Sequence, residues 1–128
     1  MKHLFLPAGL LLLAACADET SSGYATPGAE YHLREINGTA FNATATIAFP
    51  EKGAIGGQAP CNIWLADQLA PYPWFTPGPI GATRMACADL DKEQLFFEAL
   101  ETMTLIEFSG PVLLLSGGNG EKMLFEAR

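Results

Sequence analysis

The sequence has few charged residues, and basic residues are the scarcer kind. Of its 128 residues 16% are charged, and 7 Lys+Arg stand against 14 Asp+Glu, for a formal net charge of −7. No run of Lys or Arg is present to neutralise phosphates, so we expect no nucleic-acid partner. Hydrophobic residues make up 49% of the chain, which excludes global disorder. The length suits a single domain.

The groups that carry most catalysis and metal binding are also scarce. His32 is the one histidine outside the N-terminal stretch, and within an expected strand it is more simply a structural or surface residue than a general base. The three cysteines include no Cys-x-x-Cys pair, so a four-ligand zinc site is not expected. The sequence contains neither a nucleophile elbow nor a phosphate-binding loop. We therefore expect no catalytic residue, no metal and no cofactor, and hence no enzyme.

Residues 1–15 have the features of a bacterial lipoprotein signal peptide. Lys2 supplies a positive start, residues 4–13 are almost wholly apolar, and Leu13-Ala14-Ala15-Cys16 ends the segment. The apolar stretch is shorter than the ~20 residues that span a bilayer. Its ending resembles the lipobox, in which cleavage leaves a lipidated cysteine as the first residue. We expect Cys16 to carry the lipid that anchors the chain. The alternative is an ordinary cleaved signal followed by a free cysteine.

This signal places the protein in the bacterial cell envelope, facing the periplasm. In the enterobacterial lipoproteins that the segment resembles, an Asp directly after the cysteine is the inner-membrane signal. Here Ala17 takes that place and Asp18 comes one residue later, which favours the outer membrane. Loss of Lys2 with residues 1–15 brings the net charge to −8. The expected membrane contact is therefore the lipid rather than a basic patch.

Residues 16–30 are expected to be a lipidated N-terminus and flexible tether, because 18–23 and 26–28 are polar and rich in turn formers. Residues 31–128 then form the domain. We predict a compact, β-rich α+β fold of mostly antiparallel strands, with one main α-helix at about 90–103, where apolar residues recur at helical spacing. Asp89 or Asp91 can cap that helix. Apolar runs separated by glycine turns predict a C-terminal three-strand meander, at 105–108, 112–115 and 123–125.

Several motifs resemble the META (HslJ-like) domain family over almost the whole expected domain. They are Tyr31-His32-Leu33 followed by Asn37-Gly38, Gly57 with Cys61-Asn62, and Thr83-Arg84-Met85-Ala86-Cys87. Tyr31 replaces the usual tryptophan, and Pro60 replaces the glycine before Cys61. The resemblance implies a β-rich α+β fold, a link to the envelope or to stress, and no agreed enzymatic activity.

Cys61 and Cys87 are the two thiols of the expected domain, 26 residues apart. In an oxidising compartment such a pair is most simply a disulfide. Two buried free cysteines that pack as small hydrophobic residues are the alternative.

Two features are candidates for binding. The rings of Tyr72, Trp74 and Phe75 form either an exposed patch for a partner or, as we favour, a plug at one end of the sheet. Arg84 either forms an internal salt bridge, as we favour, or clasps a carboxylate.

The resulting hypothesis is a non-catalytic lipid-anchored protein that supports envelope integrity or stress tolerance by contacting an unidentified envelope protein. The alternatives are an inhibitor of an exogenous lysozyme or protease, and a pilot-like chaperone for an apolar peptide or acyl chain.

Overall fold

The computed structural model describes residues 17–128. The predictions of a signal peptide at 1–15 and of lipidation at Cys16 lie outside the described residues. The elements follow in the order η1 (Ser21–Gly23), β1 (Glu30–Ile36), β2 (Thr39–Ala40), β3 (Thr46–Ala48), β4 (Ala54–Gln58), β5 (Ile63–Asp67), β6 (Gly81–Ala82), α1 (Leu90–Thr102), β7 (Met103–Ser109), β8 (Val112–Gly117) and β9 (Lys122–Ala127).

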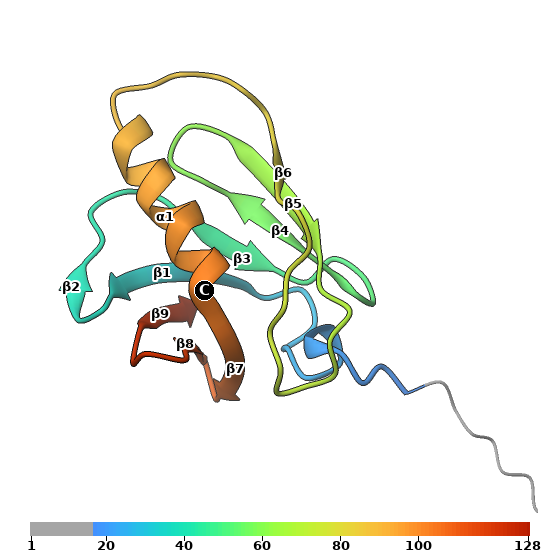
Figure 1. The fold of residues 1–128 in the computed structure, drawn as a ribbon. Helices are drawn as coiled ribbons and strands as arrows, with labels where there is room; N and C mark the ends of the chain where they lie inside the picture. Colours follow the sequence, from blue (N-terminus) through green and yellow to red (C-terminus); the bar gives the residue numbers. More distant parts are fainter. Residues whose placement is uncertain (1–16) are drawn as a thin grey trace, which may run out of the picture.

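The strands form one curled antiparallel sheet against which α1 packs (Figure 1). Their order is β6-β5-β4-β3-β1-β9-β8-β7, and the short β2 pairs with β1. β7, β8 and β9 form the expected C-terminal meander. The predicted class, α+β with mostly antiparallel strands and one main helix, is confirmed for the described residues.

The core lies between α1 and the concave face of the sheet. Phe96 and Leu100 of α1 are fully buried, and the Phe96 ring meets the Trp64 indole of β5 edge-on with centroids 5.8 Å apart. Leu95 is one of the apolar residues whose helical spacing predicts this helix, but it lies on the exposed side. Asp89 holds the N-cap position, but its carboxylate faces the Lys92 amine at 3.6 Å instead of capping the helix.

The meander strand β8 is covered more completely on one face than on the other. The continuous apolar run at 112–115 is typical of a strand buried on both faces. Leu113 and Leu115 are indeed fully buried, but Val112 and Leu114 are half-buried. β8 lies one strand from the sheet edge formed by β7, and α1 covers only the concave face.

The N-terminal segment differs from the expected flexible tether. The Tyr72 amide donates to the Glu19 carbonyl at 2.7 Å, and Thr20 forms a β-bridge with Pro71. Ser21 is buried, and its hydroxyl accepts a hydrogen bond from the Gln68 amide. In the structure, the packed unit therefore begins near residue 18 rather than at 31. Backbone hydrogen bonds and the contact between the Ser21 and Gln68 side chains hold this segment, and apolar periodicity cannot register such contacts.

Candidate interaction surface

A disulfide joins the β4–β5 turn to the segment that precedes α1. Cys61 and Cys87 are bonded, with Cα atoms 5.5 Å apart, as the simpler of the two sequence hypotheses has it. The Ala59 amide donates to the Asn62 carbonyl across the turn, and the Leu90 amide donates to the Cys87 carbonyl at the start of the helix. The bridge thus fixes the two ends of the proline-rich segment between them.

Asn62 lies beside this disulfide and uses its whole hydrogen-bonding capacity. Its amide nitrogen donates to the Met85 carbonyl at 3.0 Å and to the Glu93 carboxylate at 2.7 Å. Its side-chain oxygen accepts from the Thr83 hydroxyl at 2.8 Å and from the Met85 amide at 2.7 Å. Asn62 therefore joins the β4–β5 turn to residues 83–85 and to α1. The motifs that contain Asn62 and residues 83–87 thus have a structural role.

Glu93, on α1, completes this set of hydrogen bonds, and the sequence analysis did not single it out. We call Asn62 and Glu93, with the backbone groups that they bind, the polar latch. Its side chain accepts from the Cys61 amide at 2.9 Å as well as from Asn62, and the residue is only 5% exposed. An acid in the first turn of a helix normally suggests solvated charge. The available signal was its spacing, since Glu93 precedes Phe96 by three residues and Leu100 by seven, and thus shares their buried face.

Gly57, another motif residue, permits a close approach between β4 and β3. A Cβ atom at this position would lie 2.5 Å from the Thr46 carbonyl oxygen, so a side chain would push the strands apart. That same carbonyl accepts a hydrogen bond from the Trp64 indole at 3.1 Å. The glycine therefore keeps the Trp64 ring seated in the core.

A shallow surface depression of about 430 Å³ borders the latch. Arg84, Met85 and Ala86 line it, and all three are exposed. Among residues 17–128 the ion pairs are His32–Glu30, Arg34–Glu126 and Lys92–Asp89, so the favoured internal salt bridge of Arg84 is absent there. The guanidinium is left as a cation at the edge of an otherwise uncharged segment.

The outer face of β5 presents large aliphatic side chains to solvent. Ile63 is 59% exposed and Leu65 is 64% exposed. Leu65 pairs with Gly56 of β4 on one side and with Gly81 of β6 on the other, so no neighbouring side chain covers it. The Thr83 amide donates to the Ile63 carbonyl, which brings Met85 to the same end of β5. We call the exposed side chains Ile63, Leu65 and Met85 the aliphatic patch.

The three aromatic candidates of the proline-rich segment have three different environments. Phe75 is buried, and its amide donates to the Thr104 carbonyl on the edge strand β7. Tyr72 is half-buried between the rings of Tyr24 and Phe108, with the Tyr24 centroid 4.1 Å away. Trp74 is 56% exposed. The segment therefore supplies both the expected plug, through Phe75, and an exposed ring.

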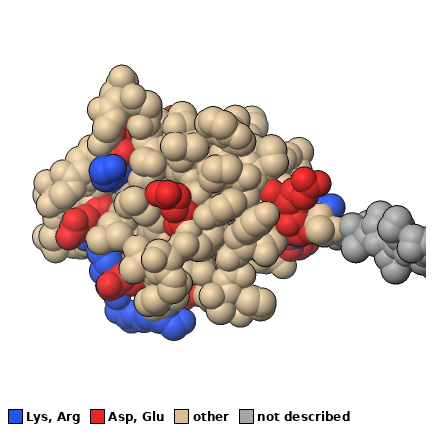
Figure 2. Space-filling view, turned by 90° about the horizontal axis from the view of Figure 1, so that it is seen from below, with Lys and Arg blue, Asp and Glu red and all other residues tan. Residues whose placement is uncertain are grey.

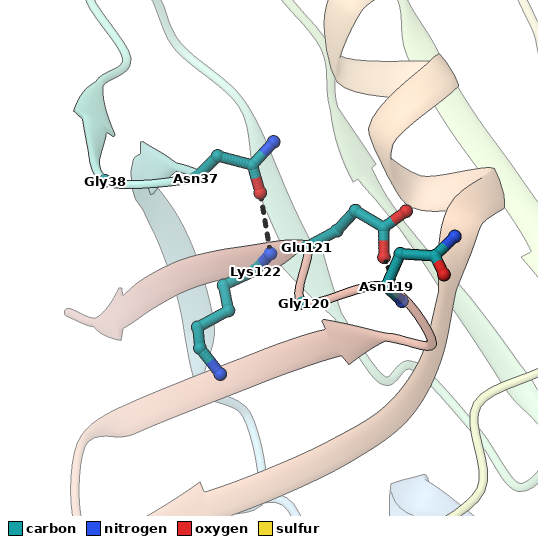
Figure 3. Close-up of a pocket in the computed structure, with 6 residues that line it drawn as sticks. All are labelled: Asn37, Gly38, Asn119, Gly120, Glu121 and Lys122. Atoms are coloured by element: carbon teal, nitrogen blue, oxygen red, sulfur yellow. Dashed lines mark hydrogen bonds between the residues drawn. The ribbon is translucent and has the colours of Figure 1, made fainter.

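A second depression lies between two turns at the other end of the sheet, and its polar groups bind one another (Figure 3). Asn37 and Gly38 both have positive φ, 51° and 82°, as a tight hairpin turn requires. The Asn37 side chain accepts from the Lys122 amide at 2.8 Å. Glu121 accepts from the Asn119 amide at 2.9 Å, and this backbone hydrogen bond lowers the pKa of the Glu121 carboxyl. Asn37 and Gly38 thus hold the turn rather than face a ligand.

Residues 17–128 bring no three His, Cys, Asp or Glu side chains together in a way that could hold a metal ion. None of the helices formed by these residues has the length and apolar character that a bilayer crossing needs.

The fold resembles two solved structures. One is an NMR structure of a protein from Burkholderia xenovorans, with a TM-score of 0.65 and 19% identity, covering 96% of this chain and 99% of that one. The other is an NMR structure with a TM-score of 0.59 and 21% identity, covering 77% of this chain and 87% of that one. No curated protein matches the chain. The family model of the META domain matches residues 25–128, and the chain belongs to the META domain family.

Proposed function

We propose that this protein is a non-catalytic, lipid-anchored protein of the bacterial envelope that binds another envelope protein and so supports envelope integrity or stress tolerance. The observation that carries the proposal is the aliphatic patch, uncovered and placed beside a rigid latch. Exposed apolar side chains grouped in this way are typical of an interface, and Met is enriched in interface cores.

Rigidity favours a binding role for the patch. The disulfide, the Asn62 amide and the Glu93 carboxylate hold the segment that carries Met85, so little conformational entropy is lost when a partner binds. Arg84 adds a cation next to the patch, and a guanidinium pairs well with a carboxylate. The partner surface that fits best is therefore apolar with an acidic group facing Arg84.

The groups that would carry catalysis are otherwise engaged. The Glu93 carboxylate is bound by Cys61 and Asn62, and His32 lies 3.3 Å from Glu30 on β1. The core is also filled, since Ile47, Ile106 and Met123 are fully buried in it. A packed interior supports surface binding over the alternative of a chaperone that encloses an acyl chain.

Site-specific cross-linking in cells tests the proposal. A photo-reactive residue at position 65 samples the aliphatic patch, and one at Glu107 of β7 samples a distant exposed strand position. We expect one stoichiometric envelope protein to be cross-linked from position 65 and not from 107. Equal labelling from both positions, or none from 65, would contradict the proposal.

Arg84→Gln sharpens the same experiment. The substitution removes the cation and keeps a polar side chain, so we expect a weaker cross-link from position 65. Arg34→Gln is the matched control, because Arg34 pairs with Glu126 on the central strands β1 and β9, which β4 and β3 separate from β5. Inhibition of lysozyme at stoichiometric protein, with no cross-linked partner, would instead support the inhibitor alternative.

A further inference from the structure

The docked N-terminal segment leaves very little free chain between the domain and Cys16. The Glu19 carbonyl is bound by the Tyr72 amide, and Thr20 bridges to Pro71. Cys16 lies three residues before Glu19, so an extended chain carries it no more than roughly 11 Å from that contact. Whatever holds Cys16 therefore lies close to the loop Leu69–Trp74.

The side chains of this loop suit a lipid headgroup region. Leu69 is 71% exposed and Trp74 is 56% exposed, while Tyr24 stacks on Tyr72 and is itself exposed. From Gln68 through Thr83 the chain has no charged residue. Trp and Tyr are enriched at membrane–water interfaces because one end of the ring is apolar and the other polar.

We infer that the loop Leu69–Trp74, with Tyr24, rests in the headgroup layer of the leaflet that holds the lipid of Cys16, so that the domain has a fixed orientation on the membrane. This inference rests on the lipidation of Cys16 proposed above. The headgroup layer is about 5–8 Å deep on each side of a bilayer, a depth comparable to the reach of the short chain. A second apolar contact also strengthens anchoring beyond what the acyl chains supply.

Acidic side chains near the loop Leu69–Trp74 determine which lipid headgroup charge suits the contact. Acidic side chains gather beside the point where the described chain begins (Figure 2), and Asp18 and Glu19 belong to that stretch. Anionic headgroups would repel them. The surface that fits is therefore zwitterionic, and anionic lipid should weaken the contact of the loop without removing the acyl anchor.

Fluorescence of the lipidated protein in vesicles tests the inference. The vesicles contain phosphatidylethanolamine and phosphatidylcholine, and a fraction of the lipid carries a nitroxide on its headgroup, which quenches tryptophan at that depth. The chain has two tryptophans, and Trp64 is buried in the core. We expect quenching of the Trp74 emission, loss of that quenching in Trp74→Phe, and weaker quenching when phosphatidylglycerol is added.

A linker variant is the matched control for the short connection. Ten Gly/Ser residues inserted between Ala17 and Asp18 keep the lipid and the docked segment but add roughly 17 Å of mean reach. Because the loop is then no longer held at the surface, we expect the Trp74 quenching to fall.

The outcomes separate the two proposals. Vesicle-bound protein whose Trp74 is unquenched and open to iodide overturns the fixed orientation and leaves the lipid anchor standing. Protein that carries no lipid on Cys16 by intact mass and does not sediment with vesicles overturns both. Trp74 that is unquenched in vesicles yet shielded from iodide in native envelopes assigns the ring to a protein partner, which also overturns the inference.

Discussion

The half of the molecule formed by α1, β1 and β7–β9 is held together differently from the half formed by the N-terminal segment, β4–β6 and the loops between them. In the first half, apolar side chains such as Leu100, Ile106 and Phe125 are fully buried. In the second half, a disulfide and a set of polar side chains hold irregular backbone in place. The most exposed large apolar residues, among them Ile63, Leu65 and Leu69, lie in this second half, whereas Leu90 and Leu95 of α1 are less exposed.

This difference suggests that one half of the molecule stabilises the fold and that the other half binds partners. The helix-and-meander half uses its apolar surface internally, so little remains for a partner. The loop half also buries Trp64 and Phe75, but a disulfide and polar hydrogen bonds fix its loops, so its remaining apolar side chains can stay exposed without the fold depending on their burial. We infer that the loop half carries the interactions of the protein and that the other half is the scaffold.

The largest effect is expected from truncating the apolar core. Leu100→Ala removes a fully buried side chain of α1 and should lower the free energy of unfolding by about 2–5 kcal/mol in chemical denaturation. Leu95→Ala makes the same chemical change on the exposed side of the same helix, so we expect a much smaller loss. Equal losses from the two variants would remove the basis for calling this half the scaffold.

Loss of the disulfide should have the next largest effect. Replacing both Cys61 and Cys87 by Ser opens a closed loop of 26 residues and is expected to cost about 3 kcal/mol on the chain-entropy model. Urea denaturation of the variant, beside the reduced and oxidised native protein, measures it. An unchanged midpoint would show that the polar latch fixes the loop half without the covalent bond.

Asn62→Ala should have a somewhat smaller effect, confined to the loop half. The substitution leaves the buried Glu93 carboxylate with fewer partners and removes the acceptor of the Met85 amide, which costs about 1–3 kcal/mol. Asn42→Ala is the control, because that side chain is exposed. Amide exchange should accelerate around 83–87 and stay unchanged in β7–β9. Uniform acceleration would mean that the two halves are one cooperative unit.

The smallest effect is a pH-dependent release of the N-terminal segment. Burial raises the pKa of the Asp18 carboxyl, but hydrogen bonds from Ser22 and Thr20 outweigh it and hold the pKa below the ordinary 3.8. Because the pKa is lowered, the hydrogen bonds of Thr20 and Ser22 to the Asp18 carboxylate contribute their full stability above pH 3.8. This contribution is lost as the pH falls through the pKa of Asp18 in the folded protein. Amide NMR signals of residues 18–25 should shift in that range, and Asp18→Asn should abolish the transition. A transition that persists in Asp18→Asn would assign it to another group.

Sequence patterns predicted the helix-and-meander half of the molecule better than the loop half. Helical spacing identified α1, and glycine turns between apolar runs identified the meander. The paired cysteines also indicated the disulfide that the structure contains. These features follow from burial and from turn chemistry, which are local in the sequence.

The latch and the docked N-terminus could not be predicted in the same way. Glu93 and Asn62 meet across 31 residues, and Gln68 and Ser21 meet across 47. Such long-range contacts produce no periodic spacing of residue types in the sequence. The prolines between 71 and 79 disfavour a long interior strand, and none forms there, but Pro73 and Phe75 still use their free backbone groups to pair with β7.

The most direct test of the division between scaffold and interaction half is hydrogen exchange of the native protein in envelopes, compared with the soluble Cys16→Ala form. We expect new protection in the envelope-bound protein at 18–25 and 63–85, with no change in β7–β9. Protection confined to β7–β9, or no difference between the two forms, would contradict it.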